Sequence, residues 1–175
     1  MRAAATLMQG WLFALTGKPS NAVLMIKSGI SAVQLTGATV GPWYSSYLAF
    51  ACAELEQFDD AWRCIDAALK TVETTKERWT EAEVNRIAGE IALMSPGSNA
   101  AKATAYFDHA LAVARKQQAK CFELRAAMSM ARLWRDQGNR DEARDLLAPV
   151  YGWFTEGFDT LDLKEAKTLL GELAS

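Results

Sequence analysis

The chain has 175 residues, with 19 Lys and Arg against 21 Asp and Glu, and half of its residues are hydrophobic. A formal net charge of −2 argues against a nucleic-acid partner, and the apolar content excludes a disordered tail. No segment approaches the roughly 20 apolar residues that would span a bilayer. We therefore expect one globular domain over residues 1–175, cytoplasmic and without a membrane partner.

Apolar residues recur three and four positions apart along nearly the whole chain, which predicts an all-α fold. The predicted helices, in chain order, are Ala3–Leu15, Pro19–Thr36, Pro42–Leu55, Asp59–Thr75, Thr80–Met94, Asn99–Gln117, Phe122–Gln137, Arg140–Phe154 and Leu161–Leu173. The first is apolar, but polar residues interrupt it and no clear cleavage site follows, so we interpret it as a core helix and not as a signal peptide.

The start of the fifth helix has a capping-box pattern. Thr80 precedes Glu83 by three residues, and each side chain of such a pair satisfies a backbone amide of the first turn. The pattern predicts that both side chains are used at the helix end.

Eight of the helices fall into four pairs that share one sequence pattern, with a spacing of about 40 residues. The second helices carry Ala22-x3-Ile26-x2-Gly29, Ala61-x3-Ile65-x2-Ala68, Ala103-x3-Phe107-x2-Ala110 and, more loosely, Ala143-x3-Leu147-x2-Val150. A small residue recurs in the first helices at Gly10, Ala49, Gly89 and Ala131. Small residues let antiparallel helices approach closely, and the large residue fills the gap. The predicted repeats are 3–36, 42–75, 80–117 and 122–154, followed by a cap at 161–173.

This pattern resembles the tetratricopeptide repeat, in which a small residue of the first helix meets Ala-x3-Phe-x2-Ala in the second. The resemblance implies an α-α superhelix of four helix pairs plus a C-terminal capping helix. The chain departs from the family in its longer repeat, and in Gln57, which stands where Gly17 and Gly138 match the family's turn glycine.

The second half of the chain has a narrower resemblance, carried by segments such as Trp79-x3-Glu83-x2-Arg86-x2-Gly89-Glu90, Ala131-Arg132-Leu133-Trp134 and Leu147-Ala148-Pro149-Val150-Tyr151. These are similar to the C-terminal helical repeats of large bacterial signalling proteins, which join a nucleotide cyclase or DNA-binding domain to a regulatory ATPase module. The resemblance implies a non-catalytic interaction, scaffolding or sensing region of such a protein, or a stand-alone relative.

Residues that carry chemistry are few. His109 has no second ligand at metal-binding spacing, and we expect it to be a structural or surface residue. Cys52, Cys64 and Cys121 are odd in number and unpaired in spacing, so we expect reduced thiols that pack as small core residues. We predict no catalytic residue, no metal site and no cofactor.

In a solenoid of helix pairs, the first helices line the concave face on which partners bind. Aligning the first helices on their small residues places an aromatic, apolar set in the first two pairs and an arginine-rich set in the last two. Arginine binds carboxylates through paired hydrogen bonds, and aromatic side chains dominate many interfaces. The predicted groove, for a protein or peptide segment with apolar and acidic residues, comprises Trp11, Trp43, Phe50, Arg86, Glu90, Met128, Arg132 and Arg135.

Three alternatives remain open for this groove. It could instead enclose a small anionic or apolar effector beside Arg86 or Arg135. Its charges could pair internally, as Glu83–Arg125 and Glu90–Arg132, which would leave Arg86 and Arg135 uncommitted. Trp11 and Trp43 could be buried against a preceding repeat.

The two ends of the repeat array differ. The N-terminal helix has an apolar surface with little charge, at Leu7, Met8, Trp11, Leu12 and Phe13. We expect this end to continue from an upstream segment or to pair with a second copy in a homodimer through the N-terminal repeat. The C-terminal helix alternates leucines with charged residues, as a polar cap does.

Overall fold

The computed structural model describes residues 2–76 and 78–174, and within these ranges it contains nine α-helices and no strand. The helices are α1 (Arg2–Leu15), α2 (Pro19–Gln34), α3 (Pro42–Glu54), α4 (Phe58–Thr75), α5 (Glu81–Met94), α6 (Ala100–Lys116), α7 (Lys120–Asp136), α8 (Arg140–Gly152) and α9 (Leu161–Leu173). A short 3-10 helix, η1 (Arg78–Thr80), precedes α5. The all-α prediction is confirmed, and each predicted helix is present.

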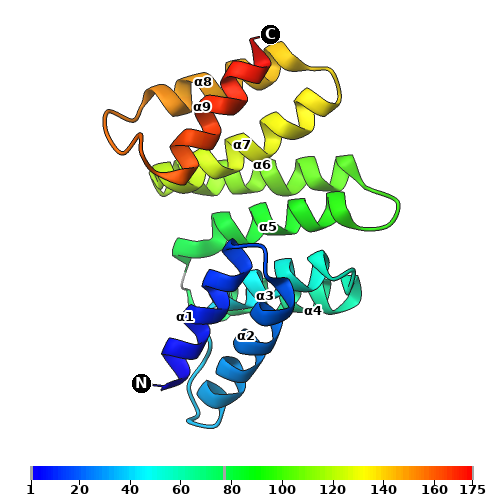
Figure 1. Ribbon diagram of the computed structural model, residues 1–175, viewed down its shortest axis with the longest axis vertical. Coiled ribbons are helices and arrows are strands. Elements are labelled where there is room, and N and C mark those ends of the chain that lie inside the picture. The colour runs from blue at the N-terminus through cyan, green and yellow to red at the C-terminus, as the bar shows by residue number, and fades with distance from the viewer. Residues whose placement is uncertain (1, 77, 175) are drawn as a thin grey trace.

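The helices stack as successive antiparallel pairs, α1/α2, α3/α4, α5/α6 and α7/α8 (Figure 1). The first helices α1, α3, α5 and α7 also contact one another in series, and the second helix of each pair contacts the first helix of the next. The last helix, α9, packs on α7 and α8 and closes the C-terminal end of the stack. Contacts therefore run between neighbours in the chain, as in a solenoid.

The recurring small residues lie where the helices of a pair come closest. A Cβ built on Gly10 would lie 2.6 Å from Ile26 Cγ1, and one built on Gly89 would lie 2.6 Å from Phe107 Cδ1. Ile26 and Phe107 are themselves fully buried. The predicted contact between a small residue and a large one is thus the packing contact within these pairs.

The turn between α3 and α4 has no glycine, and another residue adopts the backbone conformation that glycine has in other turns. Gly17 and Gly138 adopt positive φ angles of 65° and 88° between the helices of the first and fourth pairs. In the second pair Glu56 takes this role, with a φ of 60°, whereas Gln57 has a φ of −87°. The assignment of the glycine position to Gln57 is therefore wrong by one residue. Non-glycine residues rarely adopt this left-handed conformation, so the tight packing of α3 against α4 holds Glu56 there at some cost in backbone energy.

The capping-box prediction at Thr80 is wrong. The Thr80 side chain makes no capping hydrogen bond to α5, and among residues 2–76 and 78–174 its buried hydroxyl has no hydrogen-bond partner. Glu83 turns away from the helix end because its carboxylate binds groups on α3, α5 and α7. Asn99 does cap a helix, since its Oδ1 accepts a hydrogen bond from the Lys102 amide at 2.8 Å.

Candidate functional site

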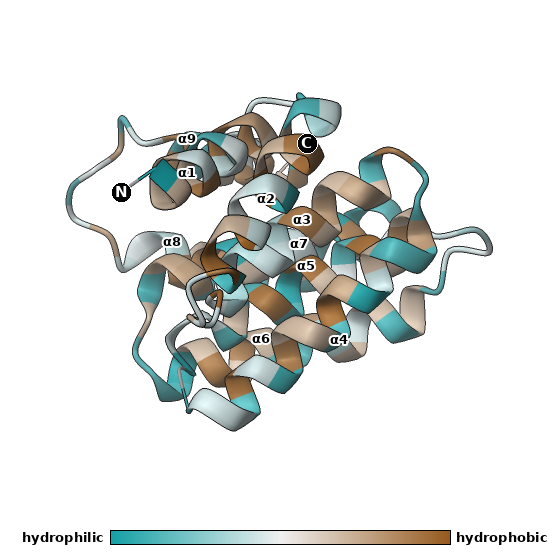
Figure 2. Ribbon diagram, turned by 90° about the horizontal axis from the view of Figure 1, so that it is seen from below, coloured by the Kyte–Doolittle hydropathy of each residue, from teal (hydrophilic) through white to brown (hydrophobic). Residues whose placement is uncertain are grey.

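A groove of about 490 Å³ runs across the first helices. Figure 2 looks along the stack and shows α1 and α9 on the side of α3, α5 and α7 that lies away from α4 and α6. We define the groove by its lining residues, which are Trp11, Ala14 and Leu15 of α1, Tyr47 and Phe50 of α3, Arg86 of α5, Arg125, Met128, Ser129 and Arg132 of α7, and Thr160, Leu161, Asp162 and Glu165 at the start of α9.

Five of the eight residues predicted for the groove line it: Trp11, Phe50, Arg86, Met128 and Arg132. The other three lie elsewhere.

Trp43 belongs to an aromatic cluster beside the groove. Glu90 accepts hydrogen bonds from Arg86 Nη1 at 3.3 Å and Ser129 Oγ at 2.6 Å, and so is used within the protein. Arg135 lies further along α7, where it pairs with Asp136 and Glu172.

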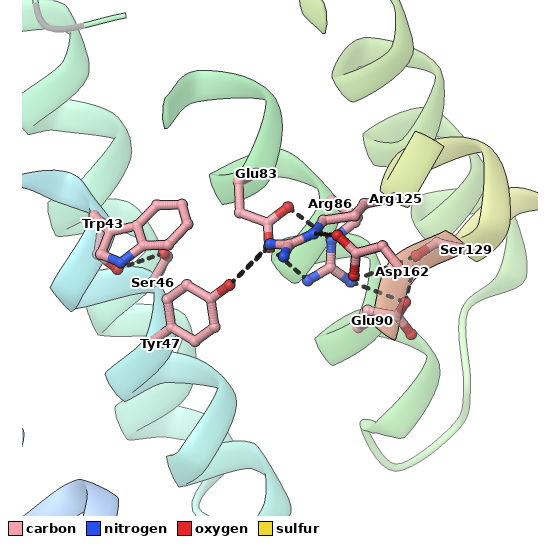
Figure 3. A network of polar contacts seen from close by, with 9 residues as sticks. All are labelled: Trp43, Ser46, Tyr47, Glu83, Arg86, Glu90, Arg125, Ser129 and Asp162. Atoms are coloured by element: carbon pink, nitrogen blue, oxygen red, sulfur yellow. Dashed lines mark hydrogen bonds and ion pairs between the residues drawn. The ribbon is translucent and has the colours of Figure 1, made fainter. Parts of the chain in front are cut away.

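A buried carboxylate, that of Glu83, organises the floor of the groove (Figure 3). Arg86 binds it with two hydrogen bonds of 2.9 Å, one from Nε and one from Nη2. The hydroxyl of Tyr47, a residue of α3, donates a third hydrogen bond of 3.0 Å to this carboxylate. Arg125 of α7 donates a fourth, of 3.3 Å, from Nη1. One carboxylate therefore connects the first helices of three successive pairs.

The charges of this network stabilise one another. Burial by itself would raise the pKa of Glu83, but the positive charges and hydrogen bonds of Arg86 and Arg125 outweigh it and hold that pKa below the ordinary value. Burial, together with the negative charge of Glu83, raises the pKa of Tyr47 to about 12. The network is thus an ionised carboxylate between two guanidinium groups, with a neutral phenol as donor.

A row of arginines on α7 continues the network toward α9. Arg125 Nε lies 2.7 Å from Asp162 Oδ2, and Arg132 Nη2 lies 2.9 Å from Glu165 Oε2. The next arginine in the row, Arg135, pairs with Glu172.

These contacts decide between the alternatives for the charges. Internal pairing occurs, and the predicted Glu83–Arg125 pair is present. The predicted Glu90–Arg132 pair is wrong, because α9 supplies Glu165 to Arg132. The expectation that Arg86 and Arg135 are uncommitted is also wrong, since each of them binds a carboxylate.

Five aromatic side chains pack together at one end of the groove. Trp43 lies at their centre, with its ring centroid 4.9 Å from that of Tyr47, 5.8 Å from those of Trp11 and Trp79, and 6.1 Å from that of Phe122. Trp11 of α1 and Trp43 of α3 thus pack on each other and on Tyr47 within the described helix pairs. The cluster holds the Trp11 side of the groove in place.

Sequence reasoning missed Tyr47 and the whole α9 side of the groove. Tyr47 lies two residues before Ala49, at a position of the first helix that the repeat buries, and a hydroxyl at a buried position has to find a partner. The sequence therefore contained a signal for Tyr47, namely a hydroxyl group at a position expected to be buried. No comparable signal placed Asp162 or Glu165, because the approach of α9 to α7 is not part of the repeat pattern.

The remaining residues singled out from the sequence lie away from the groove. His109 is exposed near α5, with Nε2 3.6 Å from Glu81 Oε1. Within the described ranges, no group of three or more His, Cys, Asp or Glu side chains could hold a metal ion. Cys52 is buried as expected and Cys64 partly so, but Cys121 is exposed and is therefore not a core residue.

Comparison with known proteins adds no identification. No family model matches the chain, and no curated protein matches it at a significant level. Among residues 2–76 and 78–174, none of the helices combines the length and the apolar character that crossing a membrane requires.

Proposed function

We propose that this chain is a non-catalytic interaction module that binds a protein or peptide segment in the groove. The serial helix pairs and their recurring contacts of small with large residues support a tetratricopeptide-like superhelix. The observation that carries the proposal is the groove itself, whose floor is held rigid by the Glu83 network before any ligand arrives. Pre-ordered sites bind more tightly because less side-chain freedom is lost on association.

The two sides of the groove favour a segment with apolar and acidic residues. Trp11, Leu15 and Phe50 provide an apolar side on α1 and α3. On the other side, the Arg132 side chain is 39% exposed and is paired with a Glu165 side chain that is 44% exposed. Because such exposed ion pairs contribute little free energy, a ligand carboxylate can replace Glu165 on Arg132 at small cost.

A peptide selection followed by matched variants tests this proposal. Peptides selected from a random library on the full chain are expected to combine acidic and apolar residues. Leu15→Glu and Arg132→Gln should each weaken their binding about tenfold or more, measured by fluorescence anisotropy. Leu24→Glu is the control, because Leu24 is an exposed leucine of α2 outside the groove. Equal affinity for all three variants would contradict the proposal.

Arg86 and Arg135 are poor choices for this test. Arg86 is held by Glu83, so its removal would disturb the fold, and Arg135 does not line the groove. Arg132 lines the groove and forms its ion pair with an exposed carboxylate, that of Glu165.

A small anionic or apolar effector is the second candidate ligand. The volume of about 490 Å³ lies in the range of pockets that bind small molecules, and Arg86 and Arg125 converge on it. A thermal-shift screen of small carboxylates and phosphates would support this candidate if one of them raises the melting temperature of the wild type but not of Arg132→Gln. Competition between that compound and a selected peptide would place both in the groove.

We further propose that the module is cytoplasmic and serves as the regulatory C-terminal repeat region, or a stand-alone relative, of a bacterial cyclase or ATPase signalling protein. This proposal rests on the resemblance of the second half of the chain to such repeats. An ATPase or cyclase segment encoded in the same reading frame would support it. The purified chain is expected to neither hydrolyse ATP nor form a cyclic nucleotide, and either activity would contradict a non-catalytic role.

A further inference from the structure

The outer face of α1 carries an exposed stripe, which we define as Ala5, Met8, Gln9 and Leu12. These residues are three and four positions apart and therefore lie on one side of the helix. Met8 is 52% exposed and Leu12 50%. None of the four lines the groove.

The equivalent face is buried in each of the later repeats. When the first helices are aligned on Gly10, Ala49, Gly89 and Ala131, the position of Met8 is occupied by Tyr47, Ile87 and Ser129, and that of Leu12 by Ala51, Ile91 and Leu133. All six of these equivalents are buried. The preceding helix pair packs against these first helices, with α1 and α2 on α3, α3 and α4 on α5, and α5 and α6 on α7. The stripe is thus a repeat-stacking face without its neighbour in the described structure.

We propose that a second copy of this chain covers the stripe, so that two chains associate head to head about a two-fold axis. The stripe has no charged residue, and the only charged residue of α1 is Arg2. Two copies of this face can therefore meet without repulsion between like charges. An isologous contact of this kind uses the same residues on both sides, and Met8 and Leu12 would lose their exposure to water.

The opposite end of the stack does not offer a comparable partner for the stripe. Helix α9 buries Leu163, Leu169 and Leu173 against α7 and α8, and its exposed surface carries Lys164, Glu165, Lys167 and Glu172. An apolar stripe offers no polar partner, so covering this surface would take Lys164, Lys167 and the exposed ion pairs of Glu165 and Glu172 out of water at a cost in free energy. Head-to-tail stacking is therefore disfavoured, and the association closes at two copies. The stripe shares no residue with the groove, so dimer formation does not depend on the proposed function.

Measuring the mass of the full chain in solution tests the proposal. Sedimentation equilibrium or light scattering over a range of concentrations should give twice the chain mass, with dissociation to one chain on dilution. Met8→Glu/Leu12→Glu should be monomeric at every concentration and retain its helical circular dichroism, because both residues are exposed within one chain.

The control variant is Leu24→Glu. Leu24 is 69% exposed, but its equivalents Arg63, Ala105 and Asp145 are exposed as well, so repeat stacking does not use this position. This variant should remain a dimer.

A charge-complementation experiment identifies the second copy as the occupant. Met8→Lys/Leu12→Lys should also be monomeric by itself, whereas an equal mixture with Met8→Glu/Leu12→Glu should form a dimer. A wild type that is monomeric at all concentrations would overturn the proposal and leave the face to a different partner. A dimer unaffected by the glutamate pair would also overturn it, as would a mass that grows without limit.

Discussion

Arg125 of α7 binds Glu83 of α5 at the floor of the groove, with Nη1 3.3 Å from Oε1. The same guanidinium binds Asp162 of α9 through Nε at 2.7 Å, and Tyr47 of α3 donates to the same Glu83 oxygen. Four helices from successive parts of the stack therefore meet at one cluster of ions. We expect this cluster to fix the relative positions of the helix pairs.

Glu83→Gln should be strongly destabilising. The substitution keeps the shape of the side chain but leaves Arg86 and Arg125 without the buried charge that compensates them. Breaking a buried ion pair in this way costs about 3–5 kcal/mol of unfolding free energy, which urea denaturation would measure. Glu165→Gln is the matched control, and its exposed pair should cost no more than about 1 kcal/mol. Equal losses would show that burial of Glu83 does not matter.

The acid dependence of stability should differ between the wild type and Glu83→Gln. Because the pKa of Glu83 is lowered in the folded chain, the unfolded chain takes up the proton first as the pH falls. The stability that Glu83 contributes is therefore complete above its ordinary pKa of about 4.3 and is lost below it. Unfolding free energies measured at a series of pH values should converge for the two proteins below about pH 4. Curves that stay parallel down to pH 3 would contradict this prediction.

Tyr47 should make the stability of the fold decrease as the pH rises in the alkaline range. Its pKa is raised from 10.0 to about 12, so the folded chain holds this proton more tightly than the unfolded chain does. The corresponding stability is complete below pH 10, falls as the pH rises toward 12, and amounts to about 3 kcal/mol. Tyr47→Phe should lack this alkaline loss, as urea denaturation at several pH values would show. An unchanged alkaline slope in the variant would exclude Tyr47 as its source.

Gly89→Ala tests the close contact within a helix pair. Alanine ordinarily stabilises a helix by about 1 kcal/mol relative to glycine, but here the new Cβ would lie 2.6 Å from Phe107 Cδ1. We expect a net loss of about 1–3 kcal/mol, since a fully buried ring has no room to move aside. Gly171→Ala in α9 meets nothing within 4 Å and should be neutral or stabilising. Thermal denaturation of both variants would show whether the two effects have opposite signs.

The sequence by itself determined the helices and their pairing. Apolar periodicity and breakers are local signals, and the contact between Gly89 and Phe107 joins two helices that follow each other in the chain. Such short-range contacts leave a repeated pattern, which is why five of the eight predicted groove residues, Phe50 and Met128 among them, do line the groove.

Only the tertiary structure decided which charges meet. Arginine side chains are long and flexible, so residues at equal levels on neighbouring helices do not identify the acceptor, and Arg132 binds Glu165 instead of Glu90. The same applies to Glu83, where a capping pattern competed with Arg86 of the same helix and with Arg125 and Tyr47 from other helices. The free energy of a buried carboxylate depends on everything that surrounds it in three dimensions, and a local sequence pattern contains only a small part of those surroundings.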